Sequence, residues 1–320
     1  MRILVVGAGA TGGYFGARLA LAGQDVTFLV RPQRADALRR RGLRLTGLGE
    51  DLRLAPQLVT AAELASAGSS DGAPAPAPYD LILLTVKATA LAPAVDDFAP
   101  AVGPGTVIVP VLNGLAHLDT LAGRFGTERV WGGVAKVVTA LNDDGDIVRL
   151  APFADLTLGE TGGGTSPRAD EMGALLNGVP GIDADVSPDI LGAMWAKWAF
   201  IVTVSAVNLL GRGTVGEVAA APGGAGLGPA VLAEAAAVAT AAGHPLPDDL
   251  LAFATETATG ADSPLTTSLY RDVRAGLPSE AEHLFGDLTD RARTLGVATP
   301  LLDVAALQLR VQERKLVSKN

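Results

Sequence analysis

Residues 2–12 read Arg-Ile-Leu-Val-Val-Gly-Ala-Gly-Ala-Thr-Gly, and this stretch decides the fold of the N-terminal half. A β-branched apolar run, Ile3–Val6, enters a glycine turn, Gly7–Gly12, and the amphipathic segment Tyr14–Ala22 follows. A second apolar run, Val26–Val30, completes the unit. Strand, G-x-G-x-x-G turn, helix and strand within about thirty residues are typical of a dinucleotide-binding fold.

Each glycine of the turn has its own expected role. Gly7 makes the tight turn, Gly9 lets the backbone approach a pyrophosphate, and Gly12 lets the helix pack close to the strand. The free N–H groups at the start of the helix favour phosphate. The context disfavours a glycine-rich turn without a ligand. The expected cofactor-binding residues of the turn are Gly7, Ala8, Gly9, Ala10, Thr11 and Gly12.

The end of the second strand indicates which dinucleotide binds. NAD-selective sites carry a carboxylate there, which accepts hydrogen bonds from the ribose. This chain instead has Arg31-Pro32-Gln33-Arg34, and guanidinium groups match phosphate geometry. The sequence therefore predicts NADP(H), with Arg31 as the first candidate for the 2′-phosphate. Arg34 is the second candidate, or else simply begins a solvated basic helix.

Length and composition exclude several classes of protein. The chain has 320 residues, 48% of them hydrophobic, which is enough for two full cores. The net charge of −9 argues against nucleic-acid binding. The absence of cysteine excludes disulfides and thiolate chemistry, and three scattered histidines make no metal-ligand pattern. The expected partner is therefore a small molecule, with no nucleic acid and no metal.

One apolar stretch has the length of a membrane span. Residues Ile190–Leu210 could cross a bilayer, but Lys197 interrupts them, and Trp195 and Trp198 lie together rather than at two interfaces. We expect a buried helix of a soluble protein. The N-terminal apolar run is broken by glycines, which argues against a signal peptide and for a cytoplasmic protein without membrane association.

The chain changes character near residue 187. Before it, apolar runs alternate with helical segments, which predicts a mostly parallel, helix-covered sheet. After it, only helical patterns follow, separated by Gly/Pro breaks. We therefore expect an α/β Rossmann-type doubly wound domain over 1–187 and an all-α substrate domain over 188–320. A low-complexity insert, Ser66–Pro78, is expected to be a flexible surface loop. Expected strands span 43–58 (strand-rich), 79–86, 106–111, 130–141, 147–158 and 182–186.

Lys197 is the strongest candidate for a catalytic residue, because it is the only charged residue in a long apolar segment that we expect to be a helix. A buried ammonium is costly unless paired, and a lysine so placed can donate a proton in general acid catalysis. The alternatives are a lysine that reaches solvent along the helix, or a structural ion pair. Glu280 could be the carboxylate partner, although Ser279-Glu280 also resembles an ordinary helix start with Ser279 as its cap.

Two further candidates follow apolar strands of the expected sheet. Lys87 and Asn113 should lie at its carboxyl edge, where they could hold the ribose and the carboxamide of the cofactor. A solvated strand end and an ordinary Asn-Gly turn are the plainer interpretations. Ser268 is a helix-start hydroxyl. Because ligands of open sheets bind beyond the strand ends, we expect the substrate in the cleft between the domains.

Taken together and in order, these residues resemble the ketopantoate reductase (2-dehydropantoate 2-reductase) family. The resemblance runs the whole chain and is carried by Gly7–Gly12, Arg31, Thr85-Val86-Lys87-Ala88, Leu112-Asn113-Gly114, Trp195-Ala196-Lys197, Gly216-Glu217, Ser268-Leu269-Tyr270-Arg271-Asp272 and Pro278-Ser279-Glu280. It implies NADPH-dependent reduction of a 2-oxo acid, most directly ketopantoate to pantoate in pantothenate biosynthesis. It also implies that Lys197 donates the proton, Glu280 is its partner, Ser268 contacts the substrate carboxylate, and Lys87 and Asn113 contact the cofactor and the active site.

The chain departs from the family pattern at four positions where asparagine is usual, namely Ile201, Ser205, Val215 and Leu265. Ser205 can still hydrogen-bond and is expected to contact substrate, whereas the other three cannot. Asn208 lies on the Lys197 face of the helix but about 16 Å further along its axis, so it is a poor substitute.

The departures leave alternatives to ketopantoate reduction. The first is reduction of a more apolar 2-oxo acid. The second is a non-catalytic NADP(H)-binding regulatory protein, and a weaker third is a related β-hydroxyacid dehydrogenase. The Ala-rich helices over 229–242 and 301–309 could pack within the subunit or form a homodimer.

Overall fold

The computed structural model describes residues 1–66 and 77–317, so most of the low-complexity insert lies outside the described residues. The chain divides into two compact units. The first joins Met1–Leu112 to His117–Ile190, and the second joins Asn113–Ala116 to the chain from Leu191 onward. Asn113 therefore belongs to the second unit by its contacts, although it follows a strand of the first.

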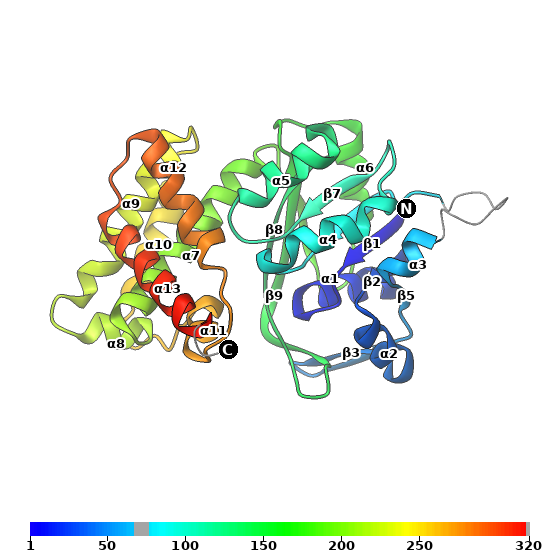
Figure 1. Ribbon diagram of the computed structural model, residues 1–320, viewed down its shortest axis with the longest axis horizontal. Coiled ribbons are helices and arrows are strands. Elements are labelled where there is room, and N and C mark those ends of the chain that lie inside the picture. Colours follow the sequence, from blue (N-terminus) through cyan, green and yellow to red (C-terminus); the bar gives the residue numbers. More distant parts are fainter. Residues whose placement is uncertain (67–76, 318–320) are drawn as a thin grey trace. The chain divides into compact units, whose positions relative to one another are not determined.

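Five parallel strands form the main sheet of the first unit, in the order β5-β2-β1-β6-β7 (Figure 1). Their bounds are β1 Arg2–Val6, β2 Asp25–Leu29, β5 Gln57–Val59, β6 Leu81–Leu84 and β7 Val107–Pro110. The connecting helices are α1 Ala10–Leu21, α2 Pro32–Arg41, α3 Ala61–Ser66, α4 Leu91–Phe98 and α5 Ala116–Phe125. Short 3₁₀ turns span Ala88–Ala90, Ala99–Ala101 and Thr127–Arg129. This order confirms the doubly wound sheet expected from the sequence.

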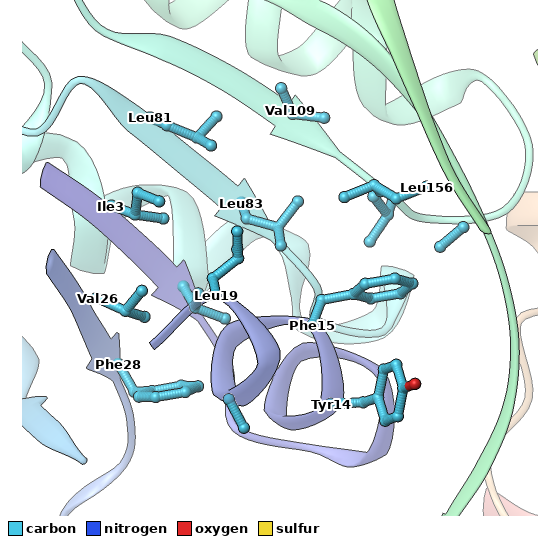
Figure 2. Packing of buried hydrophobic residues seen from close by; sticks show 14 of the residues in the cluster. Ile3, Tyr14, Phe15, Leu19, Val26, Phe28, Leu81, Leu83, Val109 and Leu156 are labelled. Atoms are coloured by element: carbon cyan, nitrogen blue, oxygen red, sulfur yellow. The ribbon is translucent and has the colours of Figure 1, made fainter. Parts of the chain in front are cut away.

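Both faces of the main sheet are buried, because alternate residues of each strand point to opposite faces. Ile3 of β1 and Leu83 of β6 lie in the core on the α1 side, where they pack with Phe15 of that helix (Figure 2). Leu4 of β1 lies in a second core with Phe98 of α4. The continuous apolar runs in the sequence follow from this two-sided burial.

A second, mixed sheet departs from the expectation of a single, mostly parallel sheet. Its strands are β3 Leu43–Gly47, β4 Glu50–Leu54, β8 Trp131–Leu141, β9 Ile147–Glu160 and β10 Asp183–Val186, and α6 spans Pro167–Leu176. The pairs β3–β4 and β8–β9 are antiparallel. A single parallel bridge between Ile108 and Val130 brings β8 alongside β7. Gly133 makes that approach possible, since a Cβ there would stand 2.5 Å from the Pro110 carbonyl oxygen.

The second unit is helical throughout its described part after residue 190. It contains α7 Ile190–Gly211, α8 Val215–Ala220, a 3₁₀ turn Gly224–Gly226, α9 Leu227–Ala241, α10 Asp248–Thr259, α11 Ser268–Arg274, a π-helix Glu282–Gly286, α12 Asp287–Leu295 and α13 Pro300–Val317. Two segments, α7 and Gly224–Ala241, are long and apolar enough to span a membrane by length and composition alone. In α7, 61% of the most apolar window is buried inside the protein.

An ion pair joins α1 to strand β4 of the second sheet and makes the stability of the fold depend on pH. Arg18 of α1 donates to Glu50 of β4, and their side chains are only 7% and 27% exposed. The hydrogen bond from Arg18 lowers the pKa of Glu50 below its ordinary 4.5. A carboxyl group with a lowered pKa in the folded state stabilises it above that ordinary value, and the stabilisation is lost as the pH falls through the lowered pKa.

Replacing Glu50 by glutamine is therefore expected to cost about 1–3 kcal/mol of unfolding free energy at neutral pH. The variant should then lose less stability than the wild type on acidification below pH 4.5, the ordinary pKa of this carboxyl. Urea unfolding at neutral and acidic pH measures both effects. Glu171→Gln, at an exposed position of α6, is the matched control. Parallel pH dependences for Glu50→Gln and wild type would contradict the assignment.

Candidate active site

The glycine turn has the geometry that a dinucleotide needs. Gly7 has a φ of +99°, in the region that favours glycine. A Cβ on Gly12 would stand 2.0 Å from the Thr85 Oγ1 atom and 2.2 Å from the Gly7 carbonyl oxygen, so only glycine fits between α1 and β6. A Cβ on Gly9 would meet no described atom within 4 Å. The side of the turn where a pyrophosphate would approach is therefore open, with Gly9 at the start of α1.

Thr85 anchors this turn, a role that the sequence did not reveal. Its hydroxyl lies 2.9 Å from the carbonyl oxygen of Val6 and 3.0 Å from that of Gly7, directly after β6. The hydroxyl thereby ties the ends of two neighbouring strands together. The only signal in the sequence is its place beside Val86-Lys87 in the quoted family motif.

The two candidate arginines lie in different surroundings. Arg31 is exposed at the N-cap position of α2. Arg34 is half-buried, and its Nη2 donates to the carbonyl oxygens of Ala8 at 3.2 Å and Gly145 at 3.0 Å. Its Nε is buried with no hydrogen-bond partner. Burial lowers the pKa of this guanidinium, although nearby Asp146 opposes the shift. Arg34 is thus attached to the glycine turn itself. The helix α2 is largely exposed, as the alternative interpretation expected, but the side chain of Arg34 is not.

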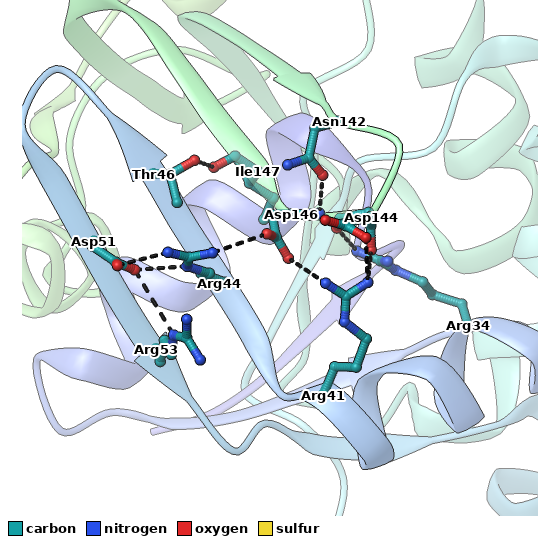
Figure 3. Close-up of polar contacts among 11 residues, drawn as sticks. Arg34, Arg41, Arg44, Thr46, Asp51, Arg53, Asn142, Asp144, Asp146 and Ile147 are labelled. Carbon is teal, nitrogen blue, oxygen red and sulfur yellow. Dashed lines mark hydrogen bonds and ion pairs between the residues drawn. The ribbon is translucent and has the colours of Figure 1, made fainter.

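An acidic turn pairs with two further arginines, Arg41 and Arg44 (Figure 3). The turn between β8 and β9 carries Asp144 and Asp146. Arg41 donates to the Asp144 carbonyl oxygen at 2.7 Å and lies 3.8 Å from Asp146, and Arg44 lies 3.5 Å from Asp146. These contacts hold the turn against α2, so Arg34 connects a fixed support to the glycine turn.

Lys87 follows β6 and Asn113 follows β7, but the two residues belong to different units. Lys87 is exposed in the first unit, at the N-cap position of a 3₁₀ turn. Asn113 is half-buried and belongs to the second unit. Gly114 beside it has a φ of +77°, and a Cβ there would stand 3.1 Å from the His283 carbonyl oxygen. The Asn-Gly turn therefore packs directly on the segment that follows Glu280.

The central helix α7 presents a stripe of predicted site residues. Lys197 and Ile201, one turn apart, are half-buried, whereas Ser205 is fully buried two turns along. The Ser205 hydroxyl donates to the Thr267 hydroxyl at 3.1 Å. A contact between Ser205 and substrate stays a prediction. In the structure, the Ser205 hydroxyl bonds to another residue of the protein, Thr267.

Asn208 has a structural role that its sequence position concealed. Its amide nitrogen donates to the carbonyl oxygens of Gly213 at 3.0 Å and Leu265 at 3.2 Å, and its side-chain oxygen accepts from the Thr267 N–H at 3.0 Å. The segment so held leads directly into Ser268, which is exposed at the start of α11. Asn208 thereby fixes the position of a predicted substrate contact.

Glu280 lies half-buried just before the π-helix. The expected cap from Ser279 is wrong, because the Ser279 hydroxyl donates to Glu313 of α13 at 2.8 Å. The Glu280 carbonyl oxygen accepts from the Leu284 N–H at 2.9 Å, so Glu280 is the first residue tied into this helix. Within residues 1–66 and 77–317, no cluster of three or more His, Asp or Glu side chains could hold a metal ion.

Two of the apolar replacements lie away from the Lys197 stripe. Val215 is fully buried in an apolar cluster with Val204 and Val207, and Leu265 packs against that cluster. Leu265 and Ile201 are both half-buried, and Ile201 is the one that lies one helical turn from Lys197. Ile201 is therefore the first candidate among the three to give a substrate site apolar character.

A dinucleotide turn on a parallel sheet, joined to a helical unit with a lysine in its central helix, is typical of a nicotinamide-dependent oxidoreductase. Comparison with known proteins identifies the family. The sequence profile of ketopantoate reductase PanE/ApbA matches residues 3–163, and that of its C-terminal part matches residues 189–313. The chain belongs to the ketopantoate reductase family and is an oxidoreductase that acts on CH–OH groups.

Individual relatives cover the whole chain. The "Uncharacterized oxidoreductase YkpB" of Bacillus subtilis (strain 168) is 30% identical over 98% of this chain and 99% of its own. A 2-dehydropantoate 2-reductase of Mesorhizobium japonicum is 28% identical over 97% of both chains. The crystal structure of 2-dehydropantoate 2-reductase from Methylococcus capsulatus superposes with a TM-score of 0.84, at 28% identity over 99% of this chain and 98% of that one.

Proposed function

We propose that this protein reduces a 2-oxo acid to a 2-hydroxy acid with NADPH, and that ketopantoate is the first substrate to test. The observation that carries the proposal is a single charged residue, Lys197, in the central helix of a ketopantoate reductase-family chain. Reduction of ketopantoate would place the protein in pantothenate biosynthesis, in the cytoplasm.

In the proposed reaction, the residues of the site have distinct roles. Bound NADPH supplies a hydride to the carbonyl carbon of the 2-oxo acid. The Lys197 ammonium gives a proton to the carbonyl oxygen, which completes the hydroxyl group. Glu280 orients that ammonium. Ser268 and Asn113 contact the substrate, and Ser205 is a third candidate for this role.

The cofactor side of the proposal rests mainly on the first unit. The backbone of residues 7–12 would hold the pyrophosphate, with Lys87 and Asn113 as further contacts. No carboxylate follows β2, and Arg31 is exposed at the N-cap position of α2. We assign the 2′-phosphate to Arg31, whereas Arg34 supports the glycine turn. NADP(H) is accordingly the proposed cofactor.

The two arginines should differ in which cofactors they affect. Arg31→Ala is expected to weaken NADPH binding about tenfold and to leave NADH binding unchanged, because it removes only a phosphate contact. Arg34→Ala should weaken both cofactors by similar factors, since it releases the Ala8 carbonyl of the turn. Fluorescence titration of each variant gives the dissociation constants. Arg40→Ala, at an exposed position of the same helix, is the control. Equal loss of NADH binding in Arg31→Ala would refute the assignment of the 2′-phosphate.

The function itself is tested by NADPH oxidation with purified protein and ketopantoate, followed by a panel of other 2-oxo acids. Turnover with ketopantoate supports the full proposal. Turnover only with more apolar acids retains the reaction class and changes the substrate. Tight NADPH binding without oxidation of any panel member would instead favour a regulatory protein that binds the cofactor.

A further inference from the structure

The helix after Glu280 contains one wide turn. Residues Glu282–Gly286 form a π-helix, and α12 continues from Asp287. A π turn is wider than an α turn and occurs frequently at functional sites. Where a helix departs from α register, a partner side chain from another element can bond to its backbone carbonyl groups.

That partner comes from the helix that carries Lys197. The indole N–H of Trp198 donates to the Leu284 carbonyl oxygen at 3.1 Å, and Trp198 is only 1% exposed. The Leu284 N–H in turn donates to the Glu280 carbonyl oxygen at 2.9 Å. Two hydrogen bonds thus run from the residue next to Lys197 to the backbone of Glu280.

The same π turn supports the Asn113 loop. Gly114 lies so close that a Cβ there would stand 3.1 Å from the His283 carbonyl oxygen and 3.5 Å from its imidazole. A shift of the turn would therefore displace the Asn-Gly loop as well. The π turn therefore touches the surroundings of three predicted site residues. It bonds to Trp198, next to Lys197, and to the backbone of Glu280, and it packs on Gly114, next to Asn113.

The opposite side of the turn is held separately. Arg310 of α13 donates to both carboxylate oxygens of Glu282, at 2.6 and 2.7 Å. The Glu282 carboxylate lies over Gly286, where a Cβ would stand 2.3 Å from one of its oxygens. The π turn is consequently fixed from outside by an ion pair and from inside by the Trp198 N–H.

We propose that Trp198 is a positioning residue, whose indole N–H holds the π turn in the register that places Glu280 and Asn113 relative to Lys197. The proposal rests on the proposed function for the roles of those three residues. If it holds, loss of this donor removes the hydrogen bond from α7 to the Leu284 carbonyl oxygen, and the turn relaxes toward α register.

The test is Trp198→Phe, which keeps an aromatic ring and removes the N–H. We expect NADPH binding to stay within about twofold of wild type and kcat to fall about tenfold, with a shifted pH–rate profile. Trp131→Phe, at a buried tryptophan of β8 in the other unit, is the matched control and should keep its kcat. Wild-type kcat and pH profile in folded Trp198→Phe would overturn the proposal.

A second readout does not depend on turnover. The pH dependence of Lys197 labelling by an amine-reactive reagent, followed by peptide mass spectrometry, reports the surroundings of its ammonium. We expect Trp198→Phe to change this dependence for Lys197 and to leave that of Lys87 unchanged. If wild type reduces no 2-oxo acid, the proposed function fails, and the labelling still decides the positioning role. If Trp198→Phe does not fold, Gly114→Ala presses on the same turn from the other side, and unchanged Lys197 labelling in it would overturn the proposal.

Discussion

Replacing Lys197 by alanine is expected to lower kcat for 2-oxo acid reduction by about 10²–10⁴-fold, the range that a positioned general acid contributes. Lys197 is the only charged side chain in α7. Its neighbours on the helix are apolar or indole side chains, so no other group of that helix can take over the proton. NADPH binding, which we assign to the first unit, should change little.

Single-turnover measurement with saturating NADPH and ketopantoate separates the chemical step from binding. Lys197→Met retains most of the side-chain volume without the ammonium and should match the alanine variant in rate. Lys136→Ala, at an exposed lysine of β8, is the control. If Lys197→Ala turned over within a few-fold of wild type, another group would be the proton donor. If it lost NADPH binding, the effect would be on folding rather than on chemistry.

Much of the fold could be predicted because burial on both faces leaves a continuous apolar run in each strand. The runs Ile3–Val6 and Val26–Val30 correspond to β1 and β2. The separate, mixed second sheet was not predicted, since local apolar content does not specify a partner strand or its direction. A hairpin signal was present, because Asp144-Gly145 separates the two runs that become β8 and β9.

The candidate site was predictable where its residues act through local geometry. The turn over 7–12 follows from glycine spacing alone. Arg34, Thr85 and Trp198 contribute through contacts with carbonyl groups far along the chain, and no local pattern records such contacts. The expected Ser279 cap failed for the same reason, because a distant glutamate on α13 takes its hydroxyl.

The apolar residues that replace asparagine differ in whether they are placed to contact a substrate. A side chain inside a packed cluster, as at Val215, adjusts to its neighbours and need not touch a ligand. Ile201 lies half-buried one helical turn from Lys197, on the face that continues to Ser205. A branched alkyl group at that position favours an alkyl part of the substrate and offers nothing to a hydroxyl group.

Ile201→Asn is therefore expected to shift substrate preference toward ketopantoate by about tenfold, measured against trimethylpyruvate, which differs only in lacking the hydroxyl. The ratio of the two kcat/KM values is the measurement, because effects on NADPH and on folding cancel in it. Val215→Asn is the matched control. Its amide would enter an apolar cluster without a partner, so it should lower the unfolding midpoint and leave the ratio unchanged. An unchanged ratio in folded Ile201→Asn would show that Ile201 does not contact the substrate, and the basis for expecting a more apolar 2-oxo acid would disappear with it.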